Sequence, residues 1–136
     1  MIFPEGYSTE PGFDPAEDHI GPFYFKEMGD TRLYAFKTED RHCNVSGILH
    51  CGVLMTFADY CLSMEATNNY KEEDCVTVSF SCEFVSGTAK GALVECRAKV
   101  TRAAGSLVFV TGEIFVGDET IFTFSSVVKR LKRDRG

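Results

Sequence analysis

One stretch of this sequence restricts the fold more than any other. Residues 50–66 read HCGVLMTFADYCLSMEA, and their apolar side chains recur at helical spacing. One face carries Val53, Leu54, Phe57, Ala58, Cys61 and Leu62, and the remaining face carries Met55, Tyr60 and Met64. A helix that is apolar on nearly all sides must be covered by other elements. The sequence therefore predicts a central helix, ended by residues 67–69, that the rest of the chain surrounds.

The segments around this helix have the pattern of strands. Residues 23–25 and 33–36 are apolar runs on either side of a turn at 28–31, which predicts a hairpin. Four further strands are expected at residues 76–84, 94–100, 107–116 and 121–128. Short links between them favour an antiparallel meander, and alternation places on one face of the first strand Val76, Val78, Phe80, Cys82 and Phe84. We therefore expect an α+β fold in which an antiparallel sheet wraps around the central helix.

The N-terminal segment differs in composition from the rest. All four prolines of the chain and five carboxylates lie within the first 22 residues. Residues 1–21 are therefore expected to be an acidic arm, irregular or with a short helix near Pro15–His19. Residues 22–136 contain no internal repeat or linker, and a total of 136 residues suits one domain.

Composition excludes several classes of protein. The net charge of −6 argues against a general nucleic-acid-binding protein, which would be basic. No apolar run approaches the roughly 18 residues of a membrane span, and the first residues lack the pattern of a signal peptide. The six cysteines therefore favour free thiols in a reduced, soluble, cytoplasmic protein over a disulfide framework. The basic segment 129–135 is either a solvated tail or a segment that attracts phosphate.

Asp59 is the one charged side chain between His50 and Glu65. Burial of an unpaired carboxylate is costly, so Asp59 either bridges a neighbouring strand, lies in an open cleft or has a catalytic role. A rise of about 1.5 Å and a rotation of about 100° per residue place His50 and Asp59 about 13 Å apart on opposite faces of the helix. If the two serve one site, Asp59 comes from a second subunit, and a two-fold dimer would hold two equivalent sites.

The start of the helix offers backbone donors. The first N–H groups, near Cys51 and Gly52, have no partner within the helix and lie at the positive end of its dipole. They are candidates for an oxyanion hole, unless the glycines there serve only a tight turn and close packing. The pairs His42-Cys43 and His50-Cys51 suggest zinc or a cysteine nucleophile, but the paired-cysteine knuckle usual in structural zinc sites is absent from the sequence. We therefore expect no metal.

The stretch from Asn44 to Asp59, NVSGILHCGVLMTFAD, resembles the N-x-x-G-x-x-H-G-G…D signature of hotdog-fold acyl-CoA thioesterases of the phenylacetate-pathway (PaaI) type. The similarity covers roughly residues 22–130 and includes VTVSF at 76–80 and VSGTAKG at 85–91. It implies a hotdog fold, in which an antiparallel sheet curls around the helix. It also implies a homodimer with a continuous sheet, often paired into a homotetramer, and an active site at the dimer interface.

The resemblance assigns roles to individual residues. Asp59 would be the nucleophile or the general base for water, and the backbone N–H of Cys51, beside Gly52, would bind the thioester oxygen. His50 and Asn44 would orient and polarise the thioester or hold water. The remaining assigned residues are Thr77, which would orient Asp59 or the attacking water, and Phe84, Val85, Ser86 and Arg102, which would contact the CoA arm and its phosphates.

One position departs from the family signature. Cys51 stands where the family has glycine, which keeps the backbone donor but adds a side chain beside the thioester. The expected function is hydrolysis of an acyl- or aroyl-CoA to the free acid and CoA, with no cofactor other than the CoA of the substrate. The departure leaves a non-catalytic acyl-CoA-binding hotdog module as the alternative. A dehydratase would need a different acid–base pair, for which the sequence shows no motif.

Overall fold

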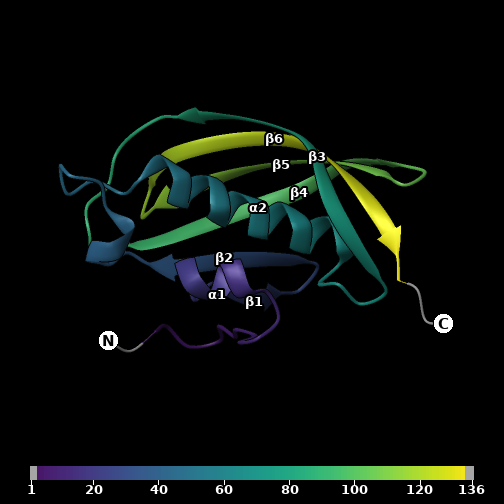
Figure 1. The fold of residues 1–136 in the computed structure, drawn as a ribbon, viewed down its shortest axis with the longest axis horizontal. Helices are drawn as coiled ribbons and strands as arrows, with labels where there is room; N and C mark the ends of the chain where they lie inside the picture. Colours follow the sequence, from purple (N-terminus) through teal and green to yellow (C-terminus); the bar gives the residue numbers. More distant parts are fainter. Residues whose placement is uncertain (1–2, 134–136) are drawn as a thin grey trace.

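The computed structural model describes residues 3–133. Along the chain the elements are α1 Pro15–Ile20, β1 Tyr24–Met28, β2 Thr31–Lys37, the 3-10 helix η1 Asp40–His42, α2 Cys51–Thr67, β3 Glu73–Phe84, β4 Leu93–Ala104, β5 Leu107–Val116 and β6 Glu119–Lys132. The six strands form one antiparallel sheet in the order β1-β2-β4-β5-β6-β3. The sheet curls around α2, and α1 lies beside β1 and β2 (Figure 1). The predicted α+β architecture is confirmed.

The burial of α2 follows the prediction on all but one side. Fully buried residues of the helix include Phe57, Ala58, Cys61 and Leu62. Cys51, Met55 and Asp59, which recur at every fourth position, remain exposed and form one strip along the helix. We call these three residues the open strip of α2. The helix therefore fills the inside of the curled sheet and leaves a single uncovered line, on which Asp59 lies.

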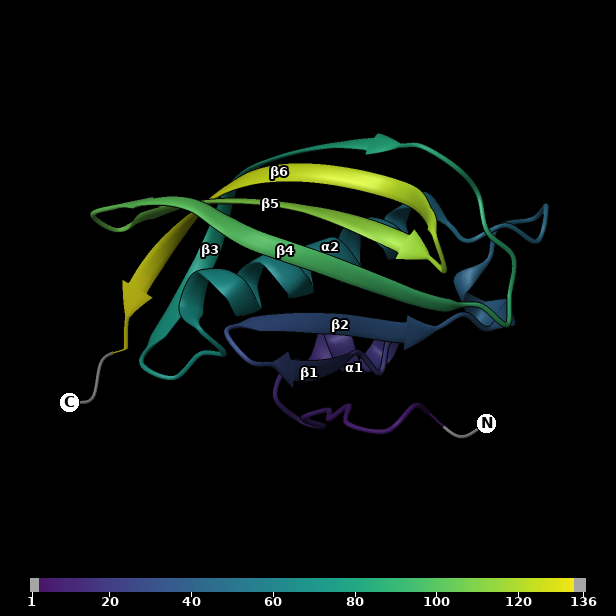
Figure 2. The same ribbon diagram turned by 180° about the vertical axis from the view of Figure 1, so that it is seen from behind.

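The predicted meander is wrong at its first strand. β4, β5 and β6 are successive neighbours, but β3 pairs with β6 and lies at the edge of the sheet. The segment 85–92 crosses from that edge to β4, which lies between β5 and β2 in the sheet (Figure 2). Alternation along the sequence predicts that a strand exists, but it does not predict which strand pairs with it. The pairing partner depends on packing around α2, and a local sequence pattern does not contain that information.

The prediction that the apolar residues of β3 share one face is also wrong. A register shift between Thr77 and Ser79 marks a β-bulge in the pairing with β6. A bulge inserts one residue and reverses the faces of the residues that follow it. Val76 and Val78 therefore remain 50% and 60% exposed, while Phe80 packs against the core. The same shift places Thr77, rather than a valine, beside α2, where its hydroxyl contacts Asp59.

The core is continuous between α2 and the sheet, and it contains thiols without disulfides. Its largest fully buried side chains include Tyr34, Phe36, Phe57 and Phe122. All six cysteines are free, and Cys61 and Cys96 are completely buried. The expectation of free thiols is confirmed. Within residues 3–133 no helix is long and apolar enough to cross a membrane.

The N-terminal arm forms the short helix that the sequence allows. Asp14 is the N-cap of α1 and accepts a hydrogen bond from the backbone N–H of Glu17 at 3.1 Å. α1 packs against α2, and this contact leaves the Glu17 side chain partly buried. Burial, followed by the nearby charges of Asp14, Asp59 and Asp18, raises the pKa of Glu17 to about 8. The carboxyl of Glu17 is thus held largely protonated at neutral pH.

The raised pKa of Glu17 predicts a pH-dependent cost to stability. The folded state holds the proton more tightly than the unfolded chain, so the free energy of unfolding decreases as pH rises from about 4.5 to about 8. Glu17→Gln removes this dependence. We expect the variant to gain about 1–2 kcal/mol relative to wild type between pH 4 and pH 9, since solvent screens a half-buried carboxyl. Urea unfolding at both pH values measures the gain.

The matched control is Glu5→Gln, which changes an exposed carboxyl of the same arm. Its stability relative to wild type should be the same at pH 4 and pH 9. Equal pH dependence in the two variants would show that Glu17 is not held in its neutral form.

Candidate active site

Asp59 lies on the open strip of α2 and is paired with a strand residue. The Thr77 hydroxyl donates a hydrogen bond of 2.6 Å to Asp59 Oδ1. The carboxylate itself is exposed, so its charge is not stranded in the core. Of the alternatives that the sequence left for Asp59, the structure therefore shows a bridge to a strand together with an open position. Asp59 Oδ2 is left available for chemistry, because Thr77 engages Oδ1.

The start of α2 is organised by His50. Its Nδ1 accepts a hydrogen bond of 2.8 Å from the backbone N–H of Gly52. The neutral ring then carries its proton on Nε2, which makes Nε2 a donor. Because Gly52 N–H is engaged by His50, the backbone donor left for an oxyanion is that of Cys51, which has no hydrogen-bond partner within residues 3–133. The predicted pair of donors at Cys51 and Gly52 is therefore reduced to one.

Asn44 holds the loop that leads into α2. Its Oδ1 accepts hydrogen bonds from the backbone N–H groups of Ser46 at 2.9 Å and Ile48 at 3.1 Å. Gly47 completes this turn with φ 76°, a conformation that side chains disfavour. The Asn44 Nδ2 group makes no hydrogen bond to any other described residue. Asn44 thus fixes the loop with its oxygen and keeps its amide donors for a ligand.

His42 supports the helix start and was not assigned this role from the sequence. It is 2% exposed, and its Nδ1 accepts from the Glu39 backbone N–H at 3.0 Å while Nε2 donates to the Ile20 carbonyl. Its own carbonyl accepts from the His50 backbone N–H at 2.8 Å. Burial lowers the pKa of His42, which favours the neutral ring that these bonds require. The pattern Glu-x-x-His before a turn, read as a capping box, is the sequence signal that could have indicated this role.

A metal site does not assemble from the two His-Cys pairs. Among residues 3–133 no group of three or more His, Cys, Asp or Glu side chains is arranged to hold a metal ion. Both ring nitrogens of His42 are hydrogen-bonded to backbone groups, and Nδ1 of His50 is hydrogen-bonded to the backbone N–H of Gly52. The ring nitrogen of His50 that is left for a ligand is therefore Nε2.

One chain brings the assigned residues together in two groups. Asp59 and Thr77 form the first, and Asn44, His50 and Cys51 form the second at the start of α2. Asp59 lies eight positions after Cys51 in the helix, which is about 12 Å along the axis. One thioester carbonyl cannot contact both groups of the same chain. If His50 and Asp59 serve one site, they must therefore come from different subunits, and this stays a prediction.

The residues assigned to CoA binding also lie in two separate regions of the chain's surface. Phe84 ends β3 and Val85 follows it; they are 49% and 56% exposed. Ser86 donates to Glu119 Oε1 at 2.5 Å. The segment after them runs beside the loop before α2, where the Leu49 N–H donates to the Thr88 carbonyl at 2.8 Å. Arg102 instead lies exposed near the β4–β5 turn, at the other end of the sheet (Figure 1). The structure does not bring Arg102 near His50 within one chain.

Comparisons with known proteins give the family. Residues 46–123 match the family model of the Thioesterase superfamily, and this chain belongs to that superfamily. The Pseudomonas aeruginosa protein named Putative esterase PA0474 is 26% identical over 129 residues, which cover 93% of this chain and 96% of that protein. These matches support a hydrolase that acts on thioesters.

Solved structures show the same fold. Conserved protein PA5202 from Pseudomonas aeruginosa superposes with a TM-score of 0.79 at 19% identity, covering 88% of this chain and 95% of that one. The E. coli PaaI protein from the phenylacetic acid degradation operon gives a TM-score of 0.79 at 15% identity, covering 88% of this chain and 86% of that one. The hotdog fold that the sequence resemblance implied is confirmed.

The capping role of His50 leads to a stability prediction. His50→Ala removes the acceptor for Gly52 N–H, so the free energy of unfolding should fall by about 1 kcal/mol. His50→Asn keeps an N-cap acceptor and should recover most of the loss. His19→Ala, which changes an exposed histidine at the end of α1, is the control and should be nearly neutral. Urea denaturation compares the three variants, and equal losses for His50→Ala and His19→Ala would contradict the capping role.

Proposed function

We propose that this protein hydrolyses an acyl- or aroyl-CoA thioester to the free acid and CoA at a site formed between two subunits. The observation that supports this most directly is the pairing of Asp59 with Thr77 on the open strip of α2. A carboxylate held by a hydroxyl, with one oxygen free and open to solvent, suits a nucleophile or a general base. Membership of the Thioesterase superfamily supplies the class of substrate.

Dimerisation through β3 would complete the site. β3 is a twelve-residue edge strand, and its Val76 and Val78 are exposed. A long edge with exposed valines invites pairing with another strand. In a two-fold dimer built on this edge, the open strip of one subunit would face that of its partner. Asp59 of one chain would then lie beside the partner's helix start, which resolves the separation of about 12 Å within a chain. We extend the proposal to a tetramer made of two such dimers.

The reaction would divide between the two groups of residues. Asp59 would attack the thioester carbonyl, or take a proton from the water that attacks it, and Thr77 would hold the carboxylate in place. The carbonyl oxygen gains negative charge as the bond forms, and the free N–H of Cys51 at the helix start would stabilise it. His50 Nε2 and the Asn44 amide would donate to the thioester or to water. The C–S bond then breaks, and CoA leaves as the thiolate, which takes up a proton. If water attacked, the free acid is formed in this step; if Asp59 attacked, water then hydrolyses the acyl-aspartyl anhydride, which releases the free acid and regenerates the carboxylate.

The CoA portion would lie along exposed residues outside this centre. Phe84 and Val85 offer apolar surface next to the loop before α2, and Ser86 fixes the turn through Glu119. Arg102, at the far end of β4, would meet the nucleotide phosphates of a substrate bound chiefly to the partner. Because the overall charge is −6, local bases rather than long-range attraction would draw in the anionic substrate.

Asp59→Asn provides the test of the mechanism. We expect the rate of CoA release from a panel of acyl- and aroyl-CoA substrates to fall by about 100-fold or more, with thermal stability retained, because the amide is neither base nor nucleophile. Thr77→Val should lower the rate less, since it removes only the positioning bond. Ser81→Ala, which removes an exposed hydroxyl of the same strand, is the control.

The assay separates hydrolysis from binding alone. Hydrolysis by Asp59→Asn at the wild-type rate would rule out the role of Asp59. Thermal stabilisation of wild type by every acyl-CoA tested, without release of CoA, would instead identify a binding module.

The exposed thiol at the helix start gives a second test. Cys51 is the one exposed cysteine, whereas the other five are buried or partly buried. Alkylation by N-ethylmaleimide would place a bulky group beside the proposed oxyanion site, so wild type should lose most of its activity. Cys51→Gly should keep both its activity and its backbone donor, and it should resist the reagent. Cys82→Ser should stay as sensitive as wild type. Equal inactivation of Cys51→Gly and wild type would contradict this placement.

A further inference from the structure

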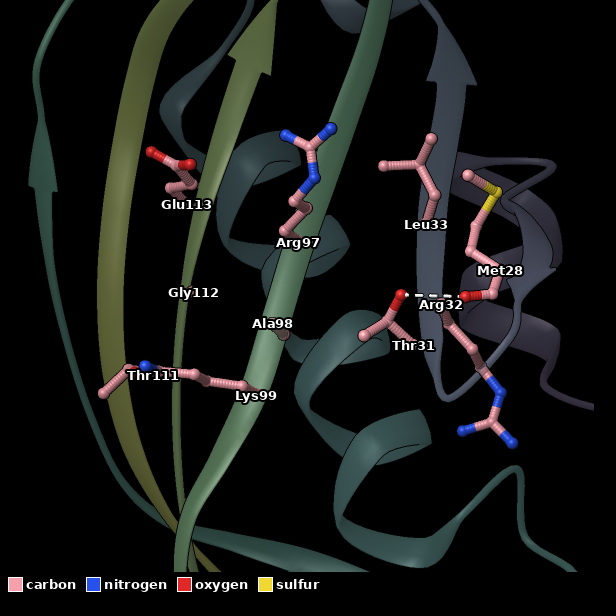
Figure 3. A pocket seen from close by; sticks show the side chains of 10 residues that line it. All are labelled: Met28, Thr31, Arg32, Leu33, Arg97, Ala98, Lys99, Thr111, Gly112 and Glu113. Atoms are coloured by element: carbon pink, nitrogen blue, oxygen red, sulfur yellow. Dashed lines mark hydrogen bonds between the residues drawn. The ribbon is translucent and has the colours of Figure 1, made fainter.

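A large hollow lies between β2 and β4, and none of the residues that line it belongs to the proposed active site. β2 and β4 pair only through Tyr34–Lys37 and Leu93–Cys96. Beyond this ladder the two strands separate, and α2 is visible behind the gap (Figure 3). The gap belongs to a hollow of about 550 Å³, which is within the usual size range of small-molecule sites. We call it the β2–β4 hollow.

Unpaired strand edges border this hollow. Ala98 of β4 and Gly112 of β5 are direct partners in the sheet, and both line it. β4 has no strand partner on its β2 side from Arg97 onward, in the part of the chain that the structure describes. A sheet edge that faces a hollow leaves backbone N–H and C=O groups to be satisfied by water or by a ligand. The hollow therefore combines apolar walls with polar edges.

Three of the charged residues that line the hollow are basic and one is acidic. Arg97 and Lys99 line it, and neither takes part in an ion pair with another of residues 3–133. The Arg97 guanidinium rests 4.5 Å from the centre of the Phe115 ring, which fixes its position. Arg32 differs, because it is neutralised by Glu27 at 2.9 Å and Glu65 at 3.7 Å. Arg97 and Lys99 thus border the hollow without an ion pair, and the Lys99 side chain extends from β4 towards Thr111 (Figure 3).

Glu113, the one acidic residue of the lining, is the cross-strand partner of Arg97 but makes no ion pair with it. Glu113 Oε2 accepts a hydrogen bond of 3.1 Å from the Thr120 hydroxyl. Figure 3 shows its carboxylate directed away from Arg97, which projects beside the gap opposite Leu33. The apolar part of the lining is contributed by Met28, Leu33 and Ala98. A complementary ligand needs an anionic group on an apolar body.

We propose that the β2–β4 hollow binds a small aliphatic or aromatic monocarboxylate. Its carboxylate would be held by Arg97 and Lys99, and its body would lie against Met28, Leu33 and Ala98. A carboxylate accepts several hydrogen bonds at once, so it also suits the free N–H groups of the β4 edge. Acids of this class would be released by the hydrolysis proposed above, but binding in the hollow does not depend on that reaction.

Methionine methyl signals distinguish this site from the active site. The protein has four methionines, of which Met28 lines the hollow and Met55 lies on the open strip of α2. They are 49% and 41% exposed, so both can report a ligand. Wild type labelled with 13C at the methionine methyls is titrated with sodium octanoate. We expect a saturable shift of the Met28 signal. Octylammonium, which has the same tail and the opposite charge, should produce no such shift.

Two double variants test the charges. Arg97→Gln with Lys99→Gln should weaken the Met28 response at least ten-fold. Lys129→Gln with Lys132→Gln removes the same charge from exposed positions of β6 and should leave the response unchanged. If the first variant fails to fold, Leu33→Glu, which adds a negative charge to the wall, should abolish the response in its place.

Three outcomes would overturn the proposal. A shift of Met55 without Met28 would mean that octanoate binds only at the active site. Equal responses to octanoate and octylammonium would mean that the charges do not select the ligand. A Met28 signal that changes on dilution without octanoate would mean that a second copy of the chain covers the hollow. CoA release by the same samples is measured separately, so failure of the hydrolytic function would leave this result unaffected.

Discussion

The fold depends on covering an apolar helix. α2 has almost no polar face. The free energy required to expose its apolar side chains to water would far exceed the stabilisation from its backbone hydrogen bonds. A single curved sheet of six strands meets this need, because it can pass around the helix rather than pack on one side of it. The edges of the sheet cannot close completely, and the line where they leave α2 open carries Cys51, Met55 and Asp59. The position of the proposed chemistry is therefore a consequence of how the helix is buried.

Some of this could be inferred from the sequence because the information is local. The apolar pattern of residues 50–66 marks the helix, and Asp59 stands out as a charge among apolar neighbours. Helix geometry alone separates Asp59 from His50 and directs attention to a second subunit. The hairpin, the short helix in the arm and the free thiols depend on turn residues and composition, which are also local properties. These inferences needed no knowledge of how the strands pair.

Other features could not be read from the sequence because they depend on distant contacts. The bulge at Thr77 reverses the faces of β3, and it is visible only in the pairing with β6, some fifty residues away. Without that bulge, Thr77 would point away from Asp59. The engagement of Gly52 by His50 has another cause, since it depends on the rotamer of one side chain. Strict alternation therefore gave the wrong faces for Val76 and Val78. The general rule that the first N–H groups of a helix lack a partner gave two oxyanion donors, of which His50 engages one.

His42 joins two parts of the chain that the sequence divides at residue 21. One ring nitrogen donates to the Ile20 carbonyl, and the His42 carbonyl accepts from the backbone of His50. Arg41 adds hydrogen bonds to the carbonyls of His19 and Ile20 at 2.9 and 3.0 Å. The N-terminal arm therefore supports the loop that precedes α2 and positions the start of that helix. A shift of the arm's backbone would also move that loop, because the hydrogen bonds are made by backbone carbonyls of the arm. The exposed side chains of the arm take no part in these bonds and can be substituted.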